Sequence, residues 1–263
     1  MRQQIIEVLK RIELEYDVKI LFACDAGSRA LGFADHDSDY DIRFIYVHKL
    51  DWYLSIDQKK DVLEVPKQDA LSIEINPLLD MSGWELTKTL RLYRKSNPSL
   101  IEWLQSKEIY LQQYSTIEKM KAMTGNIFSA KSFIIHHINI AKRNFDMCLG
   151  KKEGNIKLYL YILRSILTGR WIEKYGSVPP VEFQELIQII TPGRVKEAAL
   201  KLLSAKLAGD QHYNDLDLTI IDDFIVKEID SLESYANQHT KSQPDPTNTF
   251  NQLFRDTLKE VWT

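Results

Sequence analysis

The 263-residue sequence contains little cysteine, no strong net charge and no long hydrophobic run. Its two cysteines, Cys24 and Cys148, have no metal-binding spacing and favour a reducing cytoplasm over a disulfide-bonded secreted protein. Lys and Arg number 34 against 37 Asp and Glu, and this balance excludes a general polyanion-binding protein, so contact with nucleic acid would need a local basic patch. No apolar run is long enough to span a membrane and the N-terminus is not of signal-peptide type, so we expect a cytoplasmic protein without a membrane partner.

The sequence also lacks internal repeats and low-complexity tracts, and its pattern changes once along the chain. Strand and helix signals are mixed in the first part, whereas from about residue 115 apolar residues recur at three- and four-residue spacing. We therefore expect an α+β fold with a mixed domain at 1–112, a helical domain at 113–236, and a linker with a C-terminal helix at 237–263. The last helix would cap the core or bind a partner. The expected helices of this region cover 115–149, 155–175, 181–190, 192–208, 217–236 and 249–262.

In the first part, a helix is expected before residue 18. β-branched and aromatic runs then predict strands over 18–24, 39–47, 61–66 and 71–76. Ser82 with Glu85 three residues later fits a capping box, which predicts a helix starting there.

The most informative local pattern is Gly27-Ser28 at the end of the first strand, followed by Asp39 and Asp41. Alternate strand residues project from one face, so the two carboxylates are expected side by side. Such close like charges repel each other, and bound Mg²⁺ or Mn²⁺ would relieve this. Gly27 lets the backbone approach a phosphate, and Ser28 adds a hydroxyl and an N–H donor. A metal site beside a phosphate-binding loop predicts phosphoryl or nucleotidyl transfer.

The longer runs Gly27-Ser28-Arg29-Ala30-Leu31-Gly32-Phe33 and Asp37-Ser38-Asp39-Tyr40-Asp41 carry a family resemblance. They resemble the signature of the DNA polymerase β-like nucleotidyltransferase superfamily and, more narrowly, the predicted nucleotidyltransferases of the RNA-repair-pathway polymerase β family. The likeness continues to about residue 205 and implies a polymerase β-like nucleotidyltransferase domain, a small mixed sheet with helices, followed by an all-helical domain. This chain departs from the family in having Asp25-Ala26 where Glu-Cys or Glu-Ser is common, and Leu31 where Trp is common.

A third carboxylate on a neighbouring strand commonly completes a two-metal nucleotidyl-transfer site. Glu74 lies in the middle of the expected strand over 71–76, where an acid between apolar residues needs a reason. Asp80 lies at a strand end just before the capping box, in a segment that resembles the family. We favour Asp80 as the third metal ligand and keep Glu74 as the alternative.

Other polar residues are candidates for contact with the nucleotide. Arg29 and Arg43 would neutralise phosphate charge or pair with the acids, and Lys88 would project toward the site or into solvent. Lys157, Tyr161 and Arg164 share one helical face, which would bind base and triphosphate or form an ordinary polar edge.

These features predict a Mg²⁺-dependent enzyme that transfers NMP from an NTP to a hydroxyl acceptor. Asp39 and Asp41 would hold both metals, and Asp80 would complete the catalytic one. The family name implies an RNA 3′ end as acceptor, and a protein side chain or a small molecule remains open. The alternatives are a catalytically silent nucleotide-binding or antitoxin-like module and an aminoglycoside-like nucleotidyltransferase. Two adjacent acids argue against the silent module, which has no physical need of them.

Overall fold

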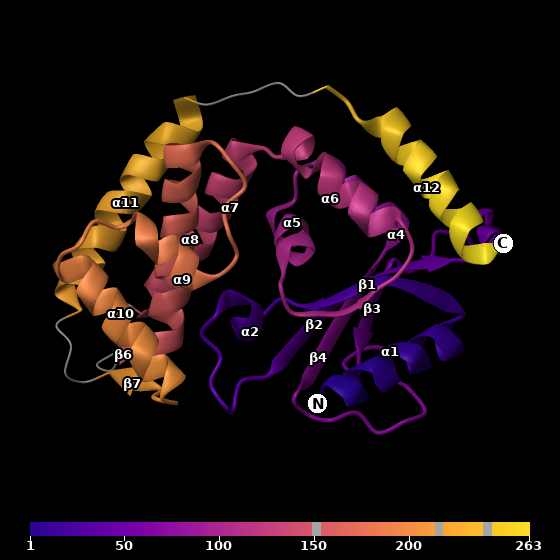
Figure 1. Ribbon diagram of the computed structural model, residues 1–263, viewed down its shortest axis with the longest axis horizontal. Helices are drawn as coiled ribbons and strands as arrows, with labels where there is room; N and C mark the ends of the chain where they lie inside the picture. Colours follow the sequence, from indigo (N-terminus) through magenta and orange to yellow (C-terminus); the bar gives the residue numbers. More distant parts are fainter. Residues whose placement is uncertain (149–153, 214–217, 239–243) are drawn as a thin grey trace. The chain divides into compact units, whose positions relative to one another are not determined.

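The computed structural model describes residues 1–148, 154–213, 218–238 and 244–263 (Figure 1). Residue contacts divide the chain into two compact units. Unit 1 comprises Met1–Ala30, Asp39–Ile127 and Gln243–Thr263, and unit 2 comprises Leu31–Ser38 and Phe128–Ser242. Residues Leu31–Ser38, which lie between Gly27-Ser28 and Asp39 in the sequence, therefore fold with the second unit.

Unit 1 is built on a five-stranded mixed sheet with the order β3-β4-β2-β1-β5. The central strands β2 and β4 run parallel, and all other neighbours are antiparallel. The strands are β1 (Val18–Asp25), β2 (Tyr40–His48), β3 (Val62–Val65), β4 (Leu79–Glu85) and β5 (Ile109–Gln112). This sheet, with its helices, confirms the predicted α+β class.

The two faces of this sheet have different roles. On one face, Ile42, Phe44 and Tyr46 of β2 join a buried core with residues of α1 (Arg2–Tyr16). Because strand side chains alternate, Asp41 and Arg43 belong to the opposite face. On that second face the ring of Trp84 lies 4.1 Å from that of Trp103 in α5 (Pro98–Gln105), measured between centroids. The predicted acid site therefore lies on the face away from α1.

The C-terminal helix α12 (Thr247–Trp262) packs against α4 (Leu86–Arg94) within unit 1. The ring of Phe250 stacks on that of buried Tyr93, and Trp262 Nε1 donates to the carbonyl of His48 at 2.8 Å. Of its two expected roles, this helix therefore fulfils the first, covering the core. The remaining helices of unit 1 are α2 (Ser28–Leu31, whose last residue is counted with unit 2), α3 (Leu50–Tyr53) and α6 (Thr116–Ile127).

Unit 2 is mainly helical, and its described residues include one short strand pairing, of β6 (Gly154–Asn155) with β7 (His212–Tyr213). Its helices are α7 (Ala130–Cys148), α8 (Ile156–Tyr175), α9 (Phe183–Leu186), α10 (Arg194–Leu207) and α11 (Thr219–Gln238), with a 3₁₀ turn over Ile187–Ile189. The single helix expected over 115–149 is two helices, because the Ser129 hydroxyl accepts the Ser132 N–H and starts α7 anew. Of the expected linker, residues 239–243 lie outside the described part.

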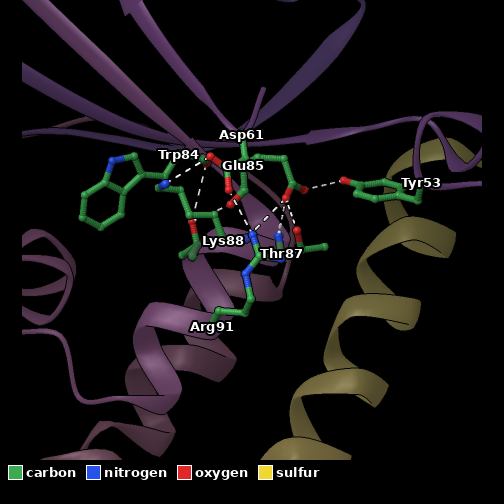
Figure 2. Close-up of polar contacts among 8 residues, drawn as sticks. Tyr53, Asp61, Trp84, Glu85, Thr87, Lys88 and Arg91 are labelled. Atoms are coloured by element: carbon green, nitrogen blue, oxygen red, sulfur yellow. Dashed lines mark hydrogen bonds and ion pairs between the residues drawn. The ribbon is translucent and has the colours of Figure 1, made fainter. Parts of the chain in front are cut away.

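Two expectations for the segment over 71–85 are wrong. No strand forms over 71–76, where Ile73 and Ile75 pack on the α1-side core and Glu74 is exposed. The capping-box pattern at Ser82 does not start a helix, since Ser82 is paired with Arg43 inside the parallel β2–β4 ladder. The helix α4 begins later, where the Glu85 carboxylate accepts the N–H groups of Thr87 and Lys88 (Figure 2). Across the described residues, no helix is long and apolar enough to cross a membrane.

Candidate functional site

The Gly-Ser loop and the first acid of the site are in direct contact. The Ala26 N–H donates to the Asp41 carbonyl at 2.9 Å, which fixes the loop on β2. A Cβ built on Gly27 would lie 1.9 Å from Asp41 Oδ2, so no larger residue fits beside that carboxylate. Ser28 begins α2 and is buried. The structure therefore places the Gly27 loop against Asp41, one of the two acids of the motif predicted from sequence.

The second acid is Asp80, whose register partner across the parallel β2–β4 pair is Asp41. Arg43 lies between them, with Nη2 3.2 Å from Asp41 Oδ1 and 3.6 Å from Asp80 Oδ2. Lys67 Nζ lies 3.1 Å from Asp80 Oδ2. Asp39 immediately precedes β2, rather than lying within it, and is exposed. The positive side chains of Arg43 and Lys67 thus neutralise the carboxylates of Asp41 and Asp80, which would otherwise repel each other. We call Asp41 and Asp80 the acid pair from here on.

The donor groups of this site suit a hard divalent cation. Carboxylate oxygens are the ligands that Mg²⁺ and Mn²⁺ prefer, and Asp41, Asp80 and upstream Asp39 supply three carboxylates. In the part of the chain that the structure describes, no three His, Cys, Asp or Glu side chains are gathered closely enough to hold an ion. The carboxylates are therefore of the chemical type that binds Mg²⁺ or Mn²⁺. A bound ion would have to replace the contacts that Arg43 and Lys67 make with Asp41 and Asp80.

Lys88 and Glu74 are not brought to the acid pair. Lys88 Nζ lies 3.1 Å from Asp61 Oδ1, and Arg91 reaches the other oxygen of the same carboxylate at 3.0 Å (Figure 2). These residues lie beyond the C-terminal end of β4, about 16 Å of strand away from Asp80 at about 3.3 Å per residue. Glu74 is exposed in the segment before β4 and has no place in the β2–β4 ladder.

Arg29 stacks its guanidinium over the ring of Tyr40, 3.8 Å from the centroid. The three candidates in unit 2 do not share one exposed face: Lys157 is exposed, whereas Arg164 is buried and donates from Nε to the Val181 carbonyl at 3.0 Å. Tyr161 packs edge-on against Phe33, with ring centroids 5.2 Å apart. Phe33 and Val181, the partners in these two contacts, both belong to unit 2.

Asp25 is a site residue that the sequence analysis did not select. It is fully buried at the end of β1, and its Oδ1 accepts the Gly27 N–H at 2.9 Å. Its Oδ2 is buried without a hydrogen-bond partner among the described residues. Burial raises the pKa of Asp25 to about 6, and the nearby charge of Asp41 adds to this against the opposing Gly27 N–H. The one signal in the sequence is an acid at a strand end two residues before Gly27.

The segment Leu31–Ser38 was also not selected, and it is anchored inside unit 2. Asp35 and Lys206 form an ion pair with both side chains almost fully buried. The Ser38 hydroxyl donates to Asp35 Oδ1 at 2.6 Å, and Gln184 donates to the Gly32 carbonyl. The hydrogen bond from Lys206 lowers the pKa of Asp35 to about 2, with Ser38 contributing. A loop aspartate facing a lysine of a distant helix gives no local sequence signal.

Comparison with known proteins shows the family of this chain. The chain is 42% identical over 263 residues to the uncharacterized protein YcgL of Bacillus subtilis (strain 168), covering all of this chain and 98% of that one. A solved nucleotidyltransferase-like protein from Exiguobacterium sibiricum 255-15 aligns at 11% identity with a TM-score of 0.32, over all of this chain and 81% of its own. That score is too low to support an argument. Residues 1–256 match the model of the RNA repair pathway DNA polymerase beta family, to which this chain therefore belongs.

Proposed function

We propose that this protein is a Mg²⁺-dependent nucleotidyltransferase that transfers NMP from an NTP to a hydroxyl acceptor. The single observation that carries the proposal is the contact of the Gly27 loop with Asp41, whose register partner is Asp80. A phosphate-binding loop in contact with one of two neighbouring carboxylates suits a triphosphate and its metal ions. Membership of the family supports the same reaction.

In this proposal Asp39, Asp41 and Asp80 would hold the ions, which would supply positive charge to neutralise the triphosphate and to lower the pKa of the acceptor hydroxyl. The Ser28 hydroxyl donates to the leaving phosphates. Asp80 accepts the proton of the attacking hydroxyl, whose oxygen forms a bond to the α-phosphorus. The bond between the α-phosphorus and its bridging oxygen breaks, and pyrophosphate leaves.

The family description favours RNA as the acceptor, and we propose transfer to its 3′ end. We place the reaction in the cytoplasm as part of the same proposal. A protein side chain and a small molecule are the other acceptors of the same chemistry. The test is to incubate the full chain with each α-³²P-labelled NTP and Mg²⁺ in the presence of RNA, of protein, or of aminoglycosides. Label on the RNA end supports the proposal in full, and label on another acceptor supports the reaction but corrects the acceptor.

Loss of the acids should abolish transfer. We expect the variant Asp39→Ala with Asp41→Ala to transfer no label and to lose the stabilisation of the wild type by Mg²⁺-ATP. The control is Asp51→Ala with Asp57→Ala, which removes two exposed acids of the same unit outside the site. A wild type that binds Mg²⁺-ATP but labels nothing would instead identify a silent nucleotide-binding module. Absence of any thermal shift would overturn the proposal.

A further inference from the structure

Arg43 is held between the register-paired Asp41 and Asp80 by both terminal nitrogens of its guanidinium. Its Nη2 contacts the carboxylates of Asp41 and Asp80, while its Nη1 donates to the carbonyls of Ile42 at 3.0 Å and Asp80 at 3.1 Å. Three hydrogen-bond acceptors and one further ion-pair contact therefore fix this side chain, and two of the acceptors are backbone atoms that do not move with the carboxylates. Because a guanidinium does not lose its proton in proteins, this is a permanent positive charge within the acid pair.

The β-strand places Arg43 there by its alternation. Arg43 follows Asp41 by two residues, so both side chains project from the same face of β2. Its register partners are the small, uncharged Cys24 on β1 and Ser82 on β4. Only 21% of the Arg43 side chain is exposed, so solvent screens its charge less than it would screen that of a fully exposed side chain.

Lys67 provides a contrast on the same acid. It contacts Asp80 through one ammonium group at 3.1 Å, and 66% of its side chain is exposed. An exposed pair of this kind is worth little, and its side chain leaves the carboxylate at low cost. Displacing Lys67 would therefore hardly affect ion binding, whereas displacing Arg43 from the carboxylates means breaking a fixed, partly buried pair.

We infer that Arg43 is a resident counter-ion of the acid site, which stabilises the acids without metal, competes with divalent ions, and makes ion binding depend on the triphosphate. The inference rests on the proposed function. A triphosphate brings oxygens that pair with guanidinium groups in the same way as carboxylates do, so it offers Arg43 a replacement partner when the carboxylates turn to the ion. Metal alone offers none, and its affinity without nucleotide is correspondingly low.

The test is calorimetric titration of Mn²⁺ into the full chain, with and without a non-hydrolysable NTP analogue. For the wild type we expect binding at least tenfold tighter with the analogue than without it. Arg43→Gln should bind Mn²⁺ alone at least tenfold tighter than the wild type and lose most of the dependence on the analogue. Lys67→Gln, the matched control, should stay within about threefold of the wild type, as expected for an exposed pair.

Arg43→Lys covers the case in which Arg43→Gln does not fold. The lysine ammonium keeps the positive charge but lacks the second terminal nitrogen, which in Arg43 donates to the two backbone carbonyls. The affinity of Arg43→Lys for Mn²⁺ alone should therefore fall between those of the wild type and Arg43→Gln. The inference is overturned if folded Arg43 variants bind Mn²⁺ alone no tighter than the wild type, or if Lys67→Gln tightens binding as much as they do. A wild type that binds no Mn²⁺ even with the analogue would refute the proposed function itself.

Discussion

The Asp41 carboxylate lies against the Cα of Gly27, so close that a Cβ at position 27 would fall 1.9 Å from Oδ2. The same loop is tied to β2 by the hydrogen bond from the Ala26 N–H to the Asp41 carbonyl. The proposed phosphate-binding loop and Asp41, which we propose as a metal ligand, therefore pack directly against each other. A change in either residue must move the other, and this leads to the first prediction.

Gly27→Ala is expected to lower the free energy of unfolding by about 1–3 kcal/mol, because the added methyl group forces the Asp41 carboxylate or the loop to shift. The variant should also lose the stabilisation by Mg²⁺-ATP that we propose for the wild type. Urea unfolding and thermal melts with and without Mg²⁺-ATP would measure both effects.

Gly125→Ala is the control for this prediction. A Cβ on Gly125, inside α6, meets nothing within 4 Å. This substitution should stabilise the protein by about 0.5–1 kcal/mol through helix propensity. Equal stabilities for Gly27→Ala and the wild type would show that the loop is not packed as described.

Asp80 and Glu74 can be separated by matched substitutions. Asp80→Asn should abolish label transfer and the Mg²⁺-dependent thermal shift, because Asp80 is the register partner of Asp41. Glu74→Gln should leave both unchanged, because Glu74 is exposed outside the sheet. The label-transfer assay decides between them, and the reverse result would make Glu74 the third acid.

Lys206→Met should strongly destabilise the protein, by about 3–5 kcal/mol, because it leaves the buried Asp35 carboxylate unpaired. The double variant Asp35→Leu with Lys206→Met should recover most of this loss, since no buried charge remains. Urea unfolding at pH 7 measures both proteins. A single variant as stable as the wild type would contradict the burial of this pair.

The same pair predicts how stability responds to acid. Because the pKa of Asp35 is lowered to about 2 in the folded state, its contribution is fully present above about pH 4 and is lost as the pH falls toward 2. The double variant should lack this part of the acid-induced loss. Unfolding free energies of the wild type and of this double variant, measured at several pH values between 2 and 5, should converge as the pH falls.

Asp25 should have the opposite pH dependence. Its folded pKa is raised to about 6, so the neutral form is favoured in the fold, and stability is lost as the pH rises from about 4 through 6. Asp25→Asn removes this dependence while an amide oxygen still accepts the Gly27 N–H. The difference in unfolding free energy between variant and wild type should therefore grow in favour of the variant across that range. A constant difference would mean that Asp25 does not titrate there.

Much of unit 1 could be predicted because its signals are local. The strand before Gly27, the loop, and the alternation that follows Asp39 each depend on neighbouring residues, and the structure confirms β1 and β2. The segment around Ser82 was predicted wrongly for the same reason: a capping box is a local pattern, and Ser82 and Glu85 satisfy it in sequence. Pairing with Arg43 in the ladder outweighs that local preference.

The residue types of the site follow from the amino-acid order: glycine and serine at the end of a strand, and two acids at alternate positions. Only tertiary structure decided which acid stands opposite Asp41, because a parallel pair is joined by hydrogen bonds between strands far apart in the chain. Arg43 meets the Asp80 carbonyl across 37 residues of sequence, and Asp35 meets Lys206 across 171. No short-range pattern encodes such contacts, since their energy arises only once each unit has brought its own distant segments together.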